Sequence, residues 1–156
     1  MHKTPGLTLT KLLAFFLVSG LFVACSDEDP EEILAKDRQK ILEYIEENDL
    51  DAYEHESGIF VVVEKEGTGE PPDASSVVLM SYHGYLLDGE TFDSGEDVYM
   101  NLGAVIPGFR FGVMEFGRGG KGTILIPSGL AYGPSGSGDI PGNAVLIFDI
   151  EIIDYN

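Results

Sequence analysis

The residues that could form a site in this sequence are aromatic and aliphatic rather than nucleophilic. They lie on expected loops and strand ends, and they are Tyr82, Phe92, Val105, Ile106, Phe109, Tyr132, Ile140 and Phe148. Taken singly, most of these side chains are what any hydrophobic core requires. The chemistry that they support as a set is non-covalent contact with an apolar group.

Covalent and metal chemistry have little support. Cys25 is the only cysteine, which excludes an internal disulfide framework and a cysteine-rich zinc site. His2, His55 and His83 are scattered without metal-ligand spacing, and neither a G-x-S-x-G elbow nor a P-loop is present. We therefore expect no metal and no cofactor. His83 follows Tyr82 in an alternating strand, so we expect it at the surface if Tyr82 points inward.

Composition and charge narrow the class of protein. The 156 residues suit one domain, and 44% are apolar, as in an ordinary globular protein. The 27 acidic side chains outnumber the 9 basic ones and give a formal charge of −18, which disfavours nucleic-acid binding through phosphate contacts. The 20 glycines and 8 prolines favour a small fold with many turns over a helical bundle.

Residues 1–24 are predicted to be a lipoprotein signal peptide. Lys3 and Lys11 form a positive leader, and the apolar run at 12–24 is shorter than the roughly 20 residues that span a bilayer. The run ends in residues 21–25, which resemble a bacterial lipobox, with Phe22 where Leu, Val or Ile is usual. This resemblance implies cleavage before Cys25 and its acylation; the alternative is an ordinary signal peptide with a free cysteine nearby. The expected location is the cell envelope, at the outer membrane on its periplasmic face or at the cell surface.

Residues 25–29 form a short acidic segment after the predicted cleavage point. One interpretation is a solvated tether that holds the domain away from the bilayer. The other is an export tag that sends the lipoprotein to the cell surface. The sequence leaves both interpretations open.

Residues 30–57 are predicted to form a helix and a linker. Asp29 can cap a helix over 30–47, and Pro30 suits its first turn. Leu34, Ile41 and Ile45 fall on one face, so the helix is expected to be a stalk or a pad packed on the following domain. A dimerisation helix is the alternative, which the short apolar stripe disfavours.

Residues 58–156 change to an extended pattern and form the predicted main domain. Apolar strands are expected at 59–63, 76–82, 97–102, 122–127 and 144–153, with one short helix at 107–116. An Asp-Gly turn lies at 88–89, and a glycine-rich loop follows Tyr132. The fold class that follows is α+β, an antiparallel sheet of about five strands wrapped around a helix.

Five segments in order along this domain carry the strongest signal for function. They are Ser81–Gly84, Leu87–Ser94, Val105–Phe109, Ala131–Gly133 and Ile140–Glu151. With these residue types and gaps, the chain resembles FK506-binding-protein-type (FKBP-type) peptidyl-prolyl cis-trans isomerases over roughly residues 58–154. The resemblance implies a curved antiparallel sheet of five to six strands around one short helix, and an enzyme that needs no cofactor. The implied substrates are X–Pro bonds in envelope or exported polypeptides, and FK506-like macrolides are implied ligands.

The resemblance also implies a role for each site residue. Tyr82 and Phe92 would form the pocket walls, and Asp93 would accept a hydrogen bond beside them. Phe109 would be the floor, where the most studied members carry Trp. Val105 would line the rim. The Ile106 N–H and the Tyr132 hydroxyl would each donate a hydrogen bond to a substrate carbonyl. Ile140 and Phe148 would close the far side of the pocket.

Two other functions fit the same residues. A non-catalytic chaperone or binding module would use the same pocket without accelerating rotation. A structural surface lipoprotein would bind no proline peptide at all. The joint presence of Tyr82, Phe92, Asp93, Ile106 and Tyr132 favours the enzyme.

Overall fold

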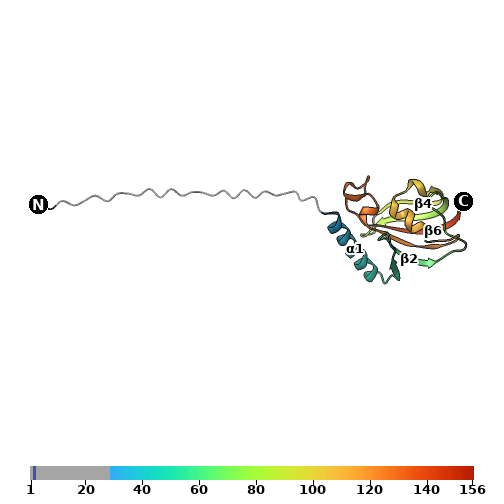
Figure 1. The fold of residues 1–156 in the computed structure, drawn as a ribbon, viewed down its shortest axis with the longest axis horizontal. Helices are drawn as coiled ribbons and strands as arrows, with labels where there is room; N and C mark the ends of the chain where they lie inside the picture. The colour runs from blue at the N-terminus through green and yellow to red at the C-terminus, as the bar shows by residue number, and fades with distance from the viewer. Residues whose placement is uncertain (1, 3–28) are drawn as a thin grey trace.

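The structure, a computed structural model, describes His2 and residues 29–156 (Figure 1). The predicted signal peptide, except for His2, lies outside the described residues. Cys25 and the rest of the acidic segment before Asp29 also lie outside them. The helices and strands are α1 (Pro30–Glu47), β1 (Ala52–Glu54), β2 (Phe60–Lys65), β3 (Val77–Leu86), β4 (Thr91–Asn101), α2 (Pro107–Val113), β5 (Lys121–Ile126) and β6 (Leu146–Tyr155). Three 3₁₀ turns lie between them: η1 (Leu102–Ala104), η2 (Ser128–Leu130) and η3 (Gly133–Ser135).

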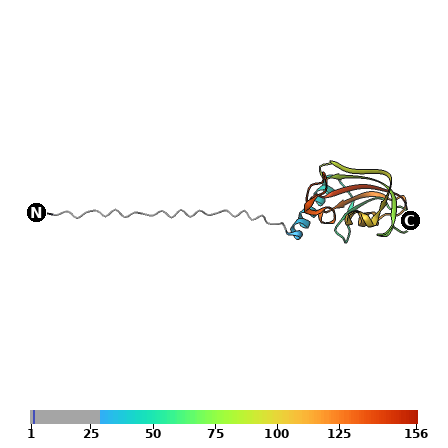
Figure 2. The same ribbon diagram turned by 90° about the horizontal axis from the view of Figure 1, so that it is seen from above.

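The six strands of residues 29–156 form one antiparallel sheet in the order β1-β2-β5-β6-β3-β4. The sheet curves around α2, which lies in its hollow (Figure 2). The predicted α+β class, a curved antiparallel sheet around a short helix with a helix before it, is confirmed.

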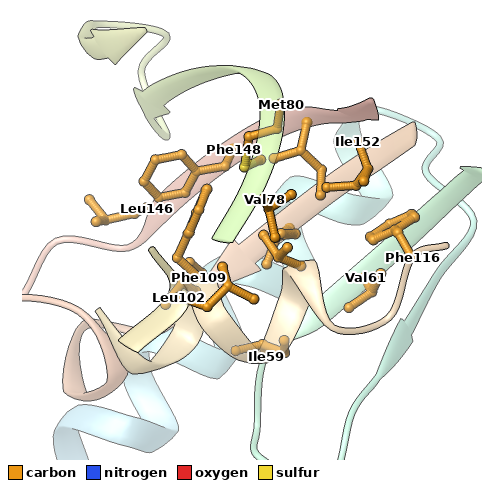
Figure 3. Close-up of a cluster of buried hydrophobic side chains, with 14 of the residues drawn as sticks. Ile59, Val61, Val78, Met80, Leu102, Phe109, Phe116, Leu146, Phe148 and Ile152 are labelled. Carbon is orange, nitrogen blue, oxygen red and sulfur yellow. The ribbon is translucent and has the colours of Figure 1, made fainter. Parts of the chain in front are cut away.

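The main core lies between the sheet and α2. Alternate residues of β6, namely Leu146, Phe148, Ile150 and Ile152, belong to this core, whereas Ile147 belongs to a second cluster on the other face. That period of two is the pleat of a strand buried on both faces. Figure 3 shows Phe109 and Phe148 at one end of the core and Phe116 at the other. The aromatic end is where the candidate site forms.

Helix α1 covers part of the other face of the sheet. It begins where the sequence predicted, because the Asp29 side chain accepts a hydrogen bond from the Glu31 N–H at 3.0 Å. Ile41 is fully buried in a cluster with Phe60 of β2 and Leu125 of β5. The predicted pad is therefore confirmed. None of the helices that the structure describes is long and apolar enough to cross a bilayer.

Candidate active site

The β3–β4 hairpin supplies one wall of the candidate site. The Tyr82 hydroxyl donates a hydrogen bond to Asp93 Oδ2 at 2.8 Å, and the Ser94 N–H donates to Asp93 Oδ1 at 2.8 Å. Burial, followed by the hydrogen bond and the charge of Asp93, raises the pKa of Tyr82 to about 12. Tyr82 therefore keeps its proton at neutral pH, and its hydroxyl holds the Asp93 carboxylate at the rim.

Three aromatic rings form the apolar interior. Phe109 of α2 and Phe148 of β6 pack edge to face with their centroids 4.8 Å apart. Tyr82 lies edge-on to Phe109 at 6.1 Å and tilted against Phe148 at 6.3 Å. The three rings come from three different elements, so the surface that they form depends on the sheet closing around α2.

Gly84 makes room for the rings. It pairs with Asp93 on one side and with Phe148 on the other. A Cβ at this position would lie 2.7 Å from Phe92 Cε2 and 2.8 Å from Phe148 Cε1, closer than carbon atoms can pack. The glycine in the Ser81–Gly84 motif therefore has a steric cause.

Val105 and Ile106 form the opposite rim, between η1 and α2. Asn101 caps η1 by accepting the Gly103 N–H at 2.9 Å, and Pro107 starts α2 directly after Ile106. Among the described residues, no hydrogen bond uses the Ile106 N–H as its donor. A backbone donor without a partner beside an apolar hollow is available to a ligand carbonyl.

Tyr132 lies between η2 and η3 and is 40% exposed. In the part of the chain that the structure describes, its hydroxyl makes no hydrogen bond, and its charge interaction with Tyr82 contributes to the raised pKa of Tyr82. The loop that follows has its own hydrogen bonds, because the Asn143 N–H donates to the Gly133 carbonyl at 2.8 Å, and Ser137 and Ile140 exchange two bonds at 2.9 Å. Tyr132 is thus attached to an internally bonded loop.

These elements enclose a cavity of about 300 Å³. Its lining is Tyr82, Asp93, Met100, Ala104, Val105, Ile106, Phe109, Tyr132 and Phe148. Seven of these nine were singled out from the sequence; the exceptions are Met100 and Ala104, which carry no motif. Two sequence candidates lie outside the lining: Phe92 packs edge-on against Phe148 at 5.3 Å, and Ile140 is 9% exposed in the core.

The cavity joins apolar walls to a few polar groups at its edge, as small-ligand sites do. Asp93 is the only acidic residue in its lining. Across the described residues, no three His, Cys, Asp or Glu side chains are grouped so that they could hold a metal ion. The arrangement is suited to holding an apolar ring with carbonyl groups on either side of it.

Comparison with known proteins identifies the class. Residues 68–153 match the family model described as FKBP-type peptidyl-prolyl cis-trans isomerase. The chain belongs to this family. FkpA of Aeromonas hydrophila, named as an isomerase of this type, is 47% identical over 102 residues, which cover 63% of this chain and 38% of FkpA. FkpA of Escherichia coli strain K12 is 40% identical over 102 residues with the same coverage. The chain therefore matches less than two fifths of the length of these relatives.

Solved structures agree with this assignment. The crystal structure of Escherichia coli FkpA superposes with a TM-score of 0.69 at 36% identity and covers 81% of this chain and 62% of that one. A peptidyl-prolyl cis-trans isomerase from Pseudomonas syringae superposes with a TM-score of 0.71 at 32% identity, over 84% of this chain and 98% of that one.

Proposed function

We propose that this protein is a peptidyl-prolyl cis-trans isomerase that accelerates rotation about X–Pro bonds in envelope or exported polypeptides. One observation carries the proposal. An apolar cavity of about 300 Å³ is bordered by the Ile106 N–H, which donates to no acceptor among the described residues, and by Tyr132, which is 40% exposed. The proline ring would enter the cavity, and the two donors would bind the carbonyls that flank it. The same hollow would accept FK506-like macrolides.

The physical chemistry of the reaction fits such a site. The barrier to rotation, about 18–20 kcal/mol, comes from amide resonance, and the cis and trans ground states of X–Pro bonds are nearly balanced. A planar amide is more polar than a twisted one, so a water-poor apolar wall favours the twisted form. The two donors fix the flanking carbonyls while the bond turns. An acceleration of 10⁴ needs only about 5.4 kcal/mol.

Tyr132→Phe tests the role of the hydroxyl. We expect kcat/KM for an X–Pro peptide to fall about 3- to 10-fold, the value of one ordinary hydrogen bond. Stability should stay within about 0.5 kcal/mol, because Tyr132 is 40% exposed. Peptide kinetics and urea unfolding measure the two quantities. Unchanged kcat/KM in both Tyr132→Phe and Asp93→Ala would show that neither side chain takes part in catalysis.

A non-catalytic chaperone or binding module using the same pocket is the second candidate. The match of residues 68–153 to the family model described as FKBP-type peptidyl-prolyl cis-trans isomerase favours the enzyme. The two functions differ in one measurement: both bind proline peptides, but only the isomerase raises the rate of cis-to-trans conversion.

We further propose that acylation of Cys25 anchors the protein in the cell envelope, at the outer membrane. The support is the lipobox-like segment before Cys25. Several acyl chains would hold the chain firmly, since each buried methylene contributes about 0.8 kcal/mol. Radiolabelled palmitate supplied to cells should label the wild-type protein and not Cys25→Ser. Equal labelling of both would contradict this proposal.

A further inference from the structure

Asp37 is an acidic residue of α1 that is buried instead of facing solvent. It is 1% exposed, and its Oδ2 accepts two hydrogen bonds from Ser128: from the N–H at 2.9 Å and from the hydroxyl at 2.5 Å. Its Oδ1 pairs with Lys40 Nζ at 3.2 Å. Ser128 is also 1% exposed. Burying a carboxylate costs free energy unless its oxygens accept hydrogen bonds or pair with a cation. The bonds to Ser128 and Lys40 provide these partners for Asp37.

Ser128 is the first residue of η2, and η2 leads to Tyr132. The Leu130 N–H donates to the Pro127 carbonyl and the Ala131 N–H to the Ser128 carbonyl, both at 3.0 Å, so the segment is a continuous bonded turn. The orientation of Tyr132 therefore follows from the orientation of η2. The Asp37 carboxylate fixes the beginning of that turn from outside the isomerase domain predicted from the sequence.

The same turn contacts the start of α2. A Cβ at Gly108 would lie 3.2 Å from both Leu130 Cβ and the Leu130 carbonyl oxygen. Since Ile106 is the N-cap of α2, the turn lies between α1 and the helix start that presents the Ile106 N–H. A shift of η2 would therefore move both Tyr132 and the start of α2 at Ile106, which lie on different sides of the cavity.

Docking of α1 does not by itself account for Asp37. Ile41 is fully buried against the sheet, and Arg38 forms a hydrogen-bonded ion pair with Glu54 at 2.8 Å. These contacts already attach the helix to β1 and to the sheet. Asp37 is directed instead to η2, the turn that leads to Tyr132.

We propose that Asp37 is a positioning residue for the isomerase site and that α1 acts on the site through it. This inference rests on the proposed function, in which Tyr132 binds a substrate carbonyl. Asp37 touches no substrate. It holds η2 through Ser128, and η2 leads to Tyr132, which lines the cavity.

The kinetic test compares three variants of the full chain. Asp37→Ala removes both bonds to Ser128, and we expect kcat/KM for an X–Pro peptide to fall about 5- to 20-fold. Asp37→Asn keeps one acceptor oxygen, which suffices because both bonds go to Oδ2, so it should stay within about twofold of wild type. Arg38→Ala breaks the neighbouring contact of α1 with Glu54 and should also stay within about twofold.

A double-mutant cycle separates positioning from general stability. If Asp37 acts through Tyr132, Tyr132→Phe should change kcat/KM less in the Asp37→Ala background than in wild type. Should Asp37→Ala fail to fold at the assay temperature, Ser128→Ala replaces it, since that variant loses the hydroxyl bond alone. Wild-type kcat/KM in a folded Asp37→Ala protein, or strictly additive effects, would overturn the inference.

Amide hydrogen exchange tests the same inference without activity. In Asp37→Ala, the Ser128 and Ala131 amides should exchange at least about tenfold faster, while the Ile124 amide in β5 is unchanged. Arg38→Ala should leave all three at the wild-type rate. Unchanged exchange at Ser128 and Ala131 would overturn the inference even if the chain is an isomerase. An inactive wild-type chain with the expected exchange pattern would contradict the proposed function and leave the structural coupling standing.

Discussion

Ile106→Pro is expected to lower kcat/KM for X–Pro peptides by about 10- to 100-fold, or about 1.4–2.7 kcal/mol, while the protein remains folded. Proline removes the backbone N–H that would bind the substrate carbonyl. The backbone accepts it without strain, because Ile106 has φ −59° and ψ 146°, and Val105 before it has φ −100° and ψ 168°. No intramolecular hydrogen bond among the described residues is lost, since none uses this donor.

The matched control for this change is Ile106→Ala, which shortens the side chain and keeps the N–H. Comparing the two variants separates the hydrogen bond from apolar contact at the rim. We expect Ile106→Ala to retain most of the turnover and Ile106→Pro to lose it. Equal kcat/KM values in the two variants, with both proteins folded by circular dichroism, would show that the N–H plays no part.

Gly84→Ala is expected to have the largest effect on the fold and to damage the site as well. The added Cβ would lie 2.7–2.8 Å from the rings of Phe92 and Phe148. Neither ring can move freely, because they pack against each other at 5.3 Å and Phe148 packs against Phe109 at 4.8 Å. Overpacking of this kind costs about 1–3 kcal/mol. Since Phe148 lines the cavity, turnover should fall too.

Urea unfolding measures the stability loss, and peptide kinetics measure the loss of turnover. Gly129→Ala is the control, because a Cβ at that exposed glycine meets no atom within 4 Å and its φ is not in the left-handed region. The control should match wild type within about 0.5 kcal/mol. A Gly84→Ala protein as stable as Gly129→Ala would contradict the packing described around Phe148.

The sequence predicted those elements whose signals are local. Asp29 and Pro30 mark the start of α1, and the predicted range 30–47 is the observed one. The Asp-Gly turn at 88–89 predicted the hairpin. The strands beside it are longer than the apolar runs indicated, because β3 continues to Leu86 and β4 already begins at Thr91. The strands are longer because Gly84, Asp93 and Ser94, which do not favour strands, are held by pairing across the hairpin.

Features that depend on tertiary contacts were not predicted. Strand β1 has three residues, with Ala52 partly buried and the other two exposed, and it exists through its pairing with β2. Leu34 was expected on the apolar face of α1 but is 51% exposed, because the sheet is reached through Ile41. The position of the short strand and the direction of the helix face are set by packing.

The site residues also fall into those that a local motif predicts and those that only tertiary contacts bring to the cavity. Residues such as Tyr82 and Tyr132 lie in recognisable motifs, so the sequence singled them out. Met100 and Ala104 are ordinary apolar residues that face the cavity only because the sheet closes around α2. Asp37 and Ser128 are 91 residues apart, and an aspartate in a highly charged helix gives no sign that it is buried. Only the fold brings this pair together.

One rate shows whether the cavity catalyses prolyl rotation. The cis-to-trans conversion of a short X–Pro peptide is followed at low temperature, where the uncatalysed reaction takes minutes. We expect a large acceleration by the wild-type chain that is lost when FK506 fills the cavity. Acceleration that FK506 does not reduce would retain the enzyme and point to Phe109 as the cause of weak macrolide binding. A folded chain that leaves the rate unchanged would contradict the claim.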